Sequence, residues 1–517
     1  MKALRAVVSG LTLLALLPLT AGPSATDYTV VAADGISVRE ATAAIRAAGG
    51  TVLSSNEAVG VYRVTSADAR FATKAAGSAK LIGASERRAI GRVAVHPAAR
   101  AVPAADVPPG PENLDPLDTK LWGLRMIRAD LARKVQRGDP GVTVGVLDTG
   151  LDAGHPDLAP HFSRALSRNF AKDMPDVDGP CEVAGCLDPV GTDDGGHGTH
   201  VAGTIGAAAD GHGISGVAPG VTLVELKGGQ DSGFFFLGPV VDALTYAGDA
   251  GIDVVNMSFF VDPWRYLCPA NPADSRKQQA EQRAIIAGLN RALKYAHQRG
   301  VTLISSLGNA HEDLGRPRVD TSSPNYGAEP YDRKVDNKTC VHMPQEGPHV
   351  VNTTALGPSG RKADYSNYGV EQAEIAAPGG DQGDGYGVAG EILSSYPKKV
   401  LEAEGLIGTD GEITEAGKGA VLKDCSSGAC AYYMYAQGTS MAAPHATGVA
   451  ALIASRGVKA VERELLRTAS DRPCPKPRLQ KYPDRPAEFA ARCEGDAEFN
   501  GFYGHGIIDA YRAVGGV

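Results

Sequence analysis

Four polar residues, widely separated in the chain, have the types and local settings needed for covalent attack on a carbonyl carbon. Asp148 ends the apolar run "GVTVGVLD", His197 stands in "DDGGHGTHVAGT", and Ser440 stands in "YAQGTSMAAPHATG". Serine, histidine and a carboxylate that meet in space supply a nucleophile, a general base and a group that orients the base. Asn309, after the apolar run in "VTLISSLGN", adds a side-chain donor for the oxyanion of the transition state.

Other chemistries for the same residues are less consistent with the sequence. An aspartic protease needs two like carboxylates that share a proton, and Asp231 in "ELKGGQDSG" does not directly follow an apolar run as Asp148 does. His197 and His200 have the spacing of a metal pair, but no H-E-x-x-H pattern and no third ligand accompany them. We therefore assign His197 as the base and His200 as a structural residue.

Plainer roles remain open for single members of the set. Ser440 at a helix start is also a cap, and the Gly-Asn pair at Asn309 is also a common turn. A cap does not require the run of small residues in "GTSMAAP". His445 is excluded as the partner of Ser440, because five positions on an ideal helix separate two side chains by about 140° and about 7.5 Å.

The elements that must position these residues alternate between apolar strands and segments of helical length. Strands are predicted at 142–147, 221–226, 253–257, 301–306, 350–354 and 374–376, and helices at 197–209, 238–250, 278–299 and 439–455. Continuous apolar strands are typical of a sheet covered on both faces. The fold class is therefore α/β, a doubly wound, mostly parallel sheet with helices on both faces. Ligands bind such sheets at the carboxyl ends of strands, where Asp148 lies.

Three regions are predicted along the chain. Residues 1–25 have the charged start and short apolar core of a signal peptide. Residues 26–112 have β-α-β-β-α-β periodicity, as in small ferredoxin-like α+β domains, and end in a Pro/Ala-rich linker. Residues 113–517 form the main domain, with surface insertions at about 259–280 and 379–435.

Composition narrows the function classes and the compartment. The chain has 517 residues, 43% of them hydrophobic, a net charge of −8 and a pI of about 5.9, which argues against nucleic-acid binding. No second apolar run of spanning length occurs, so after removal of the signal no membrane association is expected. Eight cysteines fit export and leave about 105 pairings open. Three pairs are close in sequence and one pair is left over: Cys181 with Cys186, Cys425 with Cys430, Cys474 with Cys493, and Cys268 with Cys340.

The motifs around the four polar residues resemble those of the subtilisin-like serine proteases, in the same chain order. The resemblance implies that Asp148, His197 and Ser440 form the catalytic triad and that Asn309 binds the oxyanion. It also implies two walls of the substrate channel, formed by Ser258, Phe259 and Phe260 and by Ser305, Ser306 and Leu307. These walls depart from the usual Ser-Leu-Gly and Ala-Ala-Ala, so no preferred substrate side chain is predicted.

The same resemblance implies a secreted, extracellular, monomeric endopeptidase that acts on proteins or peptides through an acyl-enzyme. Residues 26–95 then correspond to a propeptide that inhibits the cleft intramolecularly and is removed by self-processing. No cofactor is required, and calcium is left open as a structural ion, with Asp173, Asp176 and Asp178 as an oxygen-rich loop. Two alternatives remain, a non-catalytic binding protein with the same fold and a narrow processing enzyme for one partner.

Overall fold

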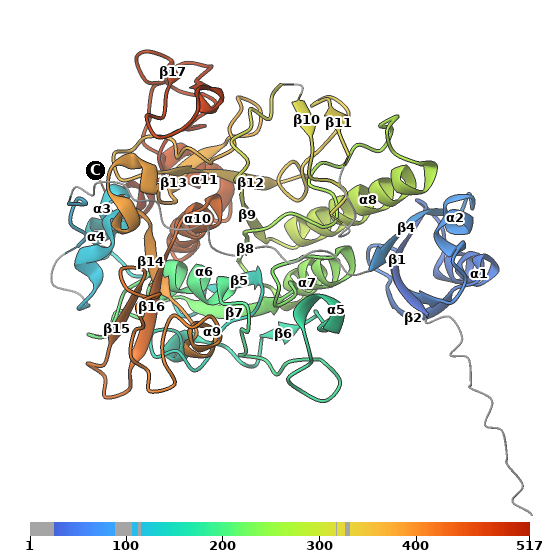
Figure 1. Ribbon diagram of the computed structural model, residues 1–517, viewed down its shortest axis with the longest axis horizontal. Coiled ribbons are helices and arrows are strands. Elements are labelled where there is room, and N and C mark those ends of the chain that lie inside the picture. The colour runs from blue at the N-terminus through green and yellow to red at the C-terminus, as the bar shows by residue number, and fades with distance from the viewer. Residues whose placement is uncertain (1–24, 88–105, 112–114, 317, 326–330, 517) are drawn as a thin grey trace, which may run out of the picture.

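The computed structural model describes residues 25–87, 106–111, 115–316, 318–325 and 331–516 (Figure 1). The predicted signal peptide and most of the predicted linker therefore lie outside the described residues. No helix within these ranges combines the length and apolar character that crossing a bilayer demands.

An N-terminal α+β unit has the element order expected from the sequence. Its elements are β1 Thr26–Ala32, α1 Val38–Ala48, β2 Thr51–Asn56, β3 Val61–Ser66, α2 Phe71–Ala76 and β4 Leu81–Arg87. The strands form an antiparallel sheet in the order β2-β3-β1-β4, which is the ferredoxin-like arrangement. Helix α1 begins at a capping box, in which the Ser37 hydroxyl accepts a hydrogen bond from the Glu40 backbone N–H.

This unit lies beside helices α7 (Leu237–Ala250) and α8 (Arg276–Gln298) at one end of the molecule (Figure 1). The Asn56 amide donates to Asp242 Oδ1 at 2.9 Å, and the Arg291 guanidinium donates to the Ala32 carbonyl at 2.9 Å. Val31 and Val61 join the hydrophobic core that contains Leu237. The contact is therefore both apolar and polar, and it uses the face of the sheet opposite α1 and α2.

The main domain is built on a seven-stranded parallel sheet in the order β13-β12-β9-β8-β5-β7-β6. Its strands are β5 Thr143–Asp148, β6 Arg168–Asn169, β7 Thr222–Lys227, β8 Val254–Met257, β9 Thr302–Ser306, β12 Val350–Leu356 and β13 Ile375–Pro378. Six of these were predicted within a few residues. The two-residue edge strand β6 was not, because it has too few residues to show a periodicity.

Helices cover both faces of the sheet, and successive strand residues face two different cores. Val144 and Val146 pack in the core with α6 (His197–Gly206) and α10 (Thr439–Ala454), whereas Leu147 packs in the core with α7 and α8. This division is the reason why the strands are apolar at consecutive positions. It confirms the doubly wound α/β class.

One of the two predicted insertions contains secondary structure of its own. Residues 379–435 contain β14 Ile392–Ser395, α9 Lys398–Ala403, β15 Val421–Asp424 and β16 Ala431–Ala436, with the strands in the order β14-β16-β15. The other insertion ends earlier than predicted, because α8 begins at Arg276 behind the capping residue Ser275. The domain boundaries themselves stay predictions.

The remaining elements are short, and disulfides hold several of the loops between them. They are α3 Trp122–Met126, α4 Ala129–Ala132, α5 Pro175–Asp178, α11 Val461–Thr468, α12 Ala510–Ala513, β10 Arg318–Asp320, β11 Arg333–Val335, β17 Leu479–Gln480 and β18 Ala491–Arg492, with 3₁₀ turns at Asp118–Lys120, Ala159–His161, Gln382–Asp384, Gly387–Gly390 and Ala487–Phe489. The disulfides are Cys181–Cys186, Cys268–Cys340, Cys425–Cys430 and Cys474–Cys493.

Candidate active site

Asp148 and His197 meet at the carboxyl edge of the sheet. Asp148 is the last residue of β5 and is fully buried, and His197 is the first residue of α6. The distance from Asp148 Oδ1 to His197 Nδ1 is 2.7 Å. Gly198 permits this approach, because a Cβ there would lie 2.0 Å from the Gly150 carbonyl oxygen.

The charge of Asp148 prepares His197 to accept a proton. Burial acts to lower the pKa of His197, but the negative charge of Asp148 and its hydrogen bond outweigh burial and raise this pKa above the usual value. A hydrogen bond from Nδ1–H to Asp148 leaves Nε2 as the basic atom of the neutral ring. The side chain is 25% exposed, so Nε2 is accessible to a reacting group.

Asp193 holds the two elements together and was missed from the sequence. Its carboxylate accepts hydrogen bonds from the Thr149 hydroxyl at 2.8 Å, the Gly196 N–H at 2.8 Å and the Thr199 N–H at 2.9 Å. It therefore joins the loop after Asp148 to the first turn of the His197 helix. The only sign of this role in the sequence was the position of Asp193 just before the His197 helix, in "TDDGGH". Acidic residues are favourable and common near helix N-termini, so this position alone did not single out Asp193.

Ser440 lies in the first turn of α10, where backbone N–H groups lack helical acceptors. Its hydroxyl donates to the Ser258 carbonyl at 3.1 Å, and the Ser258 hydroxyl donates to the Ser440 carbonyl at 3.1 Å. The second bond replaces a helical one, because Pro444 has no N–H to offer the carbonyl four residues earlier. Among the described residues no hydrogen bond joins Ser440 Oγ to His197, although both residues line the same cleft. Such bonds are often made only in the substrate complex.

Asn309 faces the same cleft with its amide oriented by Thr439. The Asn309 Oδ1 accepts hydrogen bonds from both the N–H and the hydroxyl of Thr439, each at 2.8 Å. This fixes which end of the amide is the acceptor and leaves Nδ2 as a donor beside Ser440. A side-chain amide and a helix-start N–H therefore lie beside the same cleft.

The cleft beside Ser440 has a volume of about 540 Å³ and is lined on two sides by the predicted walls. Ser258, Phe259, Phe260 and Ser306 line it. The side chains of Ser305 and Leu307 lie behind the wall instead. The Ser305 hydroxyl donates to the Met257 carbonyl at 2.9 Å, and Leu307 is buried in a separate apolar cluster.

Several cleft residues had no sequence signal of their own. Phe234 and Phe235 line the cleft, and the Phe235 ring stacks on Phe259 with 4.0 Å between ring centroids. Arg265 and His342 also line it, and they lie three residues before Cys268 and two residues after Cys340 in the sequence. Only the pairing of these two cysteines, which the sequence left open, indicates that Arg265 and His342 are neighbours.

The residues set aside as structural have structural surroundings. His200 is buried, and its Nε2 lies 3.1 Å from the carbonyl oxygens of both Ile392 and Met434, which anchors the 379–435 insertion to α6. His445 is buried and bonds the Met441 carbonyl at 2.8 Å. Asp231 is not paired with Asp148, since its carboxylate lies 2.5 Å from the buried ammonium of Lys227.

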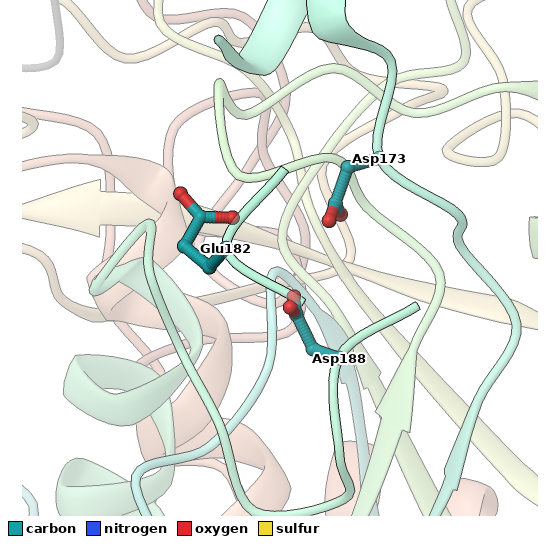
Figure 2. A group of neighbouring side chains, drawn as sticks. All are labelled: Asp173, Glu182 and Asp188. Atoms are coloured by element: carbon teal, nitrogen blue, oxygen red, sulfur yellow. The ribbon is translucent and has the colours of Figure 1, made fainter. Parts of the chain in front are cut away.

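A separate acidic cluster, formed by Asp173, Glu182 and Asp188, has the composition of a hard-cation site (Figure 2). Ligand oxygens of the three residues lie within 4.8 Å of one another. Asp173 is only 4% exposed, and both its carboxylate oxygens lack a hydrogen-bond donor among the described residues. Burial, with the charge of Asp188, raises the pKa of Asp173 to about 6.

Of the predicted acidic loop, Asp173 alone belongs to this cluster. Asp176 is exposed, and Asp178 accepts bonds from Ser232.

Comparisons with known proteins agree with this geometry. Residues 139–506 match the family described as Peptidase S8, subtilase family. The chain belongs to the subtilase family. Subtilisin DY of Bacillus licheniformis is 26% identical over 338 residues, which are 65% of this chain and 85% of that protein. Fervidolysin of Fervidobacterium pennivorans is 28% identical over 351 residues, 65% of this chain and 38% of that protein.

Solved structures show the same subtilase fold. The Staphylococcus aureus epidermin leader peptide processing serine protease has a TM-score of 0.62 at 18% identity and covers 95% of this chain and 98% of its own. Fervidolysin has a TM-score of 0.57 at 23% identity and covers 96% of this chain and 61% of its own. The chain is therefore a subtilase serine protease with a subtilisin-like fold.

Proposed function

We propose that this subtilase hydrolyses peptide bonds with Ser440 as nucleophile, His197 as general base and Asp148 as the group that orients His197. The Ser440 hydroxyl turns from the Ser258 carbonyl to His197 Nε2 and attacks the substrate carbonyl. His197 takes the hydroxyl proton and gives it to the leaving amine, and water then hydrolyses the acyl-enzyme. The observation that carries the proposal is the 2.7 Å contact between Asp148 and His197 at a cleft shared with Ser440.

The negative oxygen formed in this attack needs donors that are already in place. The Nδ2 of Asn309 and the backbone N–H of Ser440 fill this role, because Thr439 fixes the opposite end of the Asn309 amide. Donors that need no reorientation stabilise the transition state more than the substrate, and this difference is what accelerates the reaction.

The nucleophile is tested by replacing Ser440 with alanine in the full chain. The Ser440→Ala variant is expected to lose labelling by a fluorophosphonate probe and all peptidase activity. Ser427→Ala, at an exposed serine of the 379–435 insertion, is the matched control and should label normally. Normal labelling of a folded Ser440→Ala protein would contradict the assignment.

We infer further that the protein is exported and made as a self-processed precursor, in which the unit of residues 26–87 inhibits the main domain. The polar and apolar contacts of this unit with α7 and α8 support the inference. Its last strand ends at Arg87, whose guanidinium donates to the Lys172 carbonyl of the main domain. The unit therefore remains bound after cleavage of the chain beyond Arg87, as an inhibitor must.

This part is tested by expressing the chain with Ser440 intact or replaced. The intact protein should lose its N-terminal region, and N-terminal sequencing should place the cut after residue 87. The Ser440→Ala precursor should stay whole and monomeric. Addition of the separate N-terminal unit should inhibit the mature protein, and failure to inhibit would reject the inhibitory role while leaving the catalytic assignment in place.

We also infer that Asp173, Glu182 and Asp188 bind calcium as a structural ion. Oxygen ligands from carboxylates suit calcium, and the Cys181–Cys186 disulfide restricts the loop that carries Glu182. A ligand bound only to the folded state stabilises it by about 2.7 kcal/mol at a hundred times its Kd. Calcium should therefore raise the Tm of the native protein, with a smaller shift in Asp173→Asn and an unchanged shift in Asp176→Asn. An absence of any calcium-dependent shift in the native protein would reject the site.

A further inference from the structure

The cleft continues past Ser440 into a recess between the two walls, and a buried imidazole forms its floor. His342 lines the cleft and is only 2% exposed. A Cβ on Gly308, the residue before Asn309, would lie 3.1 Å from His342 Cε1, so the ring lies directly against one wall. On the other wall, the Phe260 ring centroid is 5.9 Å from that of His342. A substrate side chain that enters between the walls therefore meets His342.

The floor offers hydrogen-bonding groups that the protein itself does not use. Neither ring nitrogen of His342 has a hydrogen-bond partner among the described residues, and the buried Gln345 Oε1 also lacks one. Gln345 is held in place by its other end, since its amide donates to the Phe259 carbonyl at 2.7 Å. Buried polar groups are normally paired, and exceptions of this kind at the base of a cleft indicate a place for a polar ligand.

A guanidinium beside His342 gives the recess a positive charge. The backbone of Leu267 exchanges two hydrogen bonds with Val341, each at 2.9 Å, and the Cys268–Cys340 disulfide links the next residues. Arg265 is two residues before Leu267, and His342 is one residue after Val341. The pairing of Leu267 with Val341 therefore places them on adjacent segments, and both line the cleft. Burial is the main reason why the pKa of His342 is lowered to about 3, and the charges of Arg265 and Arg318 lower it further.

No described carboxylate forms a direct ion pair with Arg265, although the charge of Arg265 acts on Glu312 from a longer distance. Arg318 differs, because its guanidinium lies 2.8 Å from Glu312. For Arg265, the only hydrogen bond among the described residues is made by its backbone N–H, which donates to the Ser323 hydroxyl oxygen at 2.9 Å. An aliphatic substrate side chain in the recess would cover this cation and the imidazole without pairing them, which is unfavourable. A carboxylate would pair both.

We propose that the recess binds the carboxylate side chain of glutamate or aspartate at the substrate residue that supplies the scissile carbonyl, with Arg265 as the charge partner and His342 as the hydrogen-bond donor. The proposal rests on the proposed function and names the substrate class of that same site. It makes Arg265 and His342 specificity-determining residues of a protease that cuts after acidic residues.

The test compares peptide substrates that differ only at this residue, which is Glu, Gln or Leu. Loss of one charge-assisted contact is expected to lower kcat/KM for the Gln peptide by roughly 100-fold relative to the Glu peptide. In Arg265→Gln the Glu peptide should fall to about the rate of the Gln peptide, whose own rate should change little. Arg276→Gln, at an exposed arginine at the start of α8, is the matched control and should keep the preference.

Fluorophosphonate labelling of each protein separates the two ways in which the experiment can fail. A protein that labels at Ser440 but cleaves the Gln or Leu peptide as fast as the Glu peptide overturns the specificity proposal alone. Retention of the Glu preference in Arg265→Gln overturns the role of Arg265. A folded native protein that neither labels nor cleaves overturns the proposed function and, with it, the specificity proposal.

Discussion

Ser258 and Ser440 exchange a pair of hydrogen bonds, in which the hydroxyl of each residue donates to the backbone carbonyl of the other at 3.1 Å. The pair ties one wall of the cleft to the first turn of α10. The Asn256 amide donates in turn to the Ser258 hydroxyl at 2.9 Å, so the wall, the helix and the end of β8 form one network. The position of Ser440, the proposed nucleophile, therefore depends on Ser258, which has no part in the proposed proton transfer.

Replacement of Ser258 by alanine should disturb the position of Ser440 without removing it. The Ser440 carbonyl, which Pro444 already deprives of a helical partner, would lose its donor at a cost of about 0.5–1.5 kcal/mol. We expect a lower Tm and a slower rate of fluorophosphonate labelling that still goes to completion. Unchanged labelling kinetics would show that the pair does not position the nucleophile. Ser427→Ala again serves as the exposed control.

The pH profile of activity should report the proton affinity of His197. Its pKa in the folded protein lies above the ordinary value of about 6.5 for histidine. Only the neutral ring accepts the Ser440 proton, so kcat/KM should be low at acid pH and rise as the pH increases through this raised pKa. A limb centred below pH 6 would contradict the assignment. The same interaction stabilises the fold at low pH and is lost as the pH rises through the folded pKa.

Asp193→Asn should shift that profile as well as lower activity. Burial lowers the pKa of His197, the charge and hydrogen bond of Asp148 raise it, and the charge of Asp193 adds a smaller contribution in the same direction as Asp148. We therefore expect the acid limb of kcat/KM to move to lower pH, with kcat reduced because an amide cannot accept all of the bonds from Thr149, Gly196 and Thr199. Lower kcat without a change in the profile would indicate a purely structural role.

Asn309→Ala should reduce kcat with little effect on KM. In the proposed mechanism its Nδ2 bonds the oxygen that becomes negative in the transition state rather than the ground-state substrate. A loss of about 10²–10³ in kcat is the size measured for the corresponding donor of subtilisin, a member of the same family. Steady-state kinetics on one peptide separate the two constants. A change confined to KM would place Asn309 in substrate binding instead.

Lys227→Met should destabilise the protein far more than loss of a surface lysine. The Lys227 ammonium is fully buried between Asp188 at 3.0 Å and Asp231 at 2.5 Å. Its removal leaves buried carboxylates without a counter-charge, at a cost of about 3–5 kcal/mol. Lys418→Met removes an exposed lysine paired with Glu415 and should cost about 0–1 kcal/mol. Denaturant unfolding of both variants measures the difference, and equal losses would contradict the argument.

The sequence predicts the sheet, its main helices and the meeting of Asp148 with His197, because each signal is local. Apolar runs mark the strands, and the carboxyl end of a parallel strand is where the functional side chains gather. Arg265 and His342 were not predicted, because they are brought together by a disulfide between residues far apart in the chain. Asp173 was among the predicted acidic residues, but Glu182 and Asp188 were not, because a cation site depends on how loops fold against one another.

Helix α10 begins at Thr439, one residue before Ser440, and then runs buried through the middle of the main domain. Ser440 thus belongs to the same buried helix as the central core, and the Ser258 hydroxyl holds its carbonyl, which Pro444 leaves without a helical donor. Heat should therefore abolish serine reactivity and the packed interior in a single step. The rate at which a fluorophosphonate stops reacting becomes a direct measure of global unfolding.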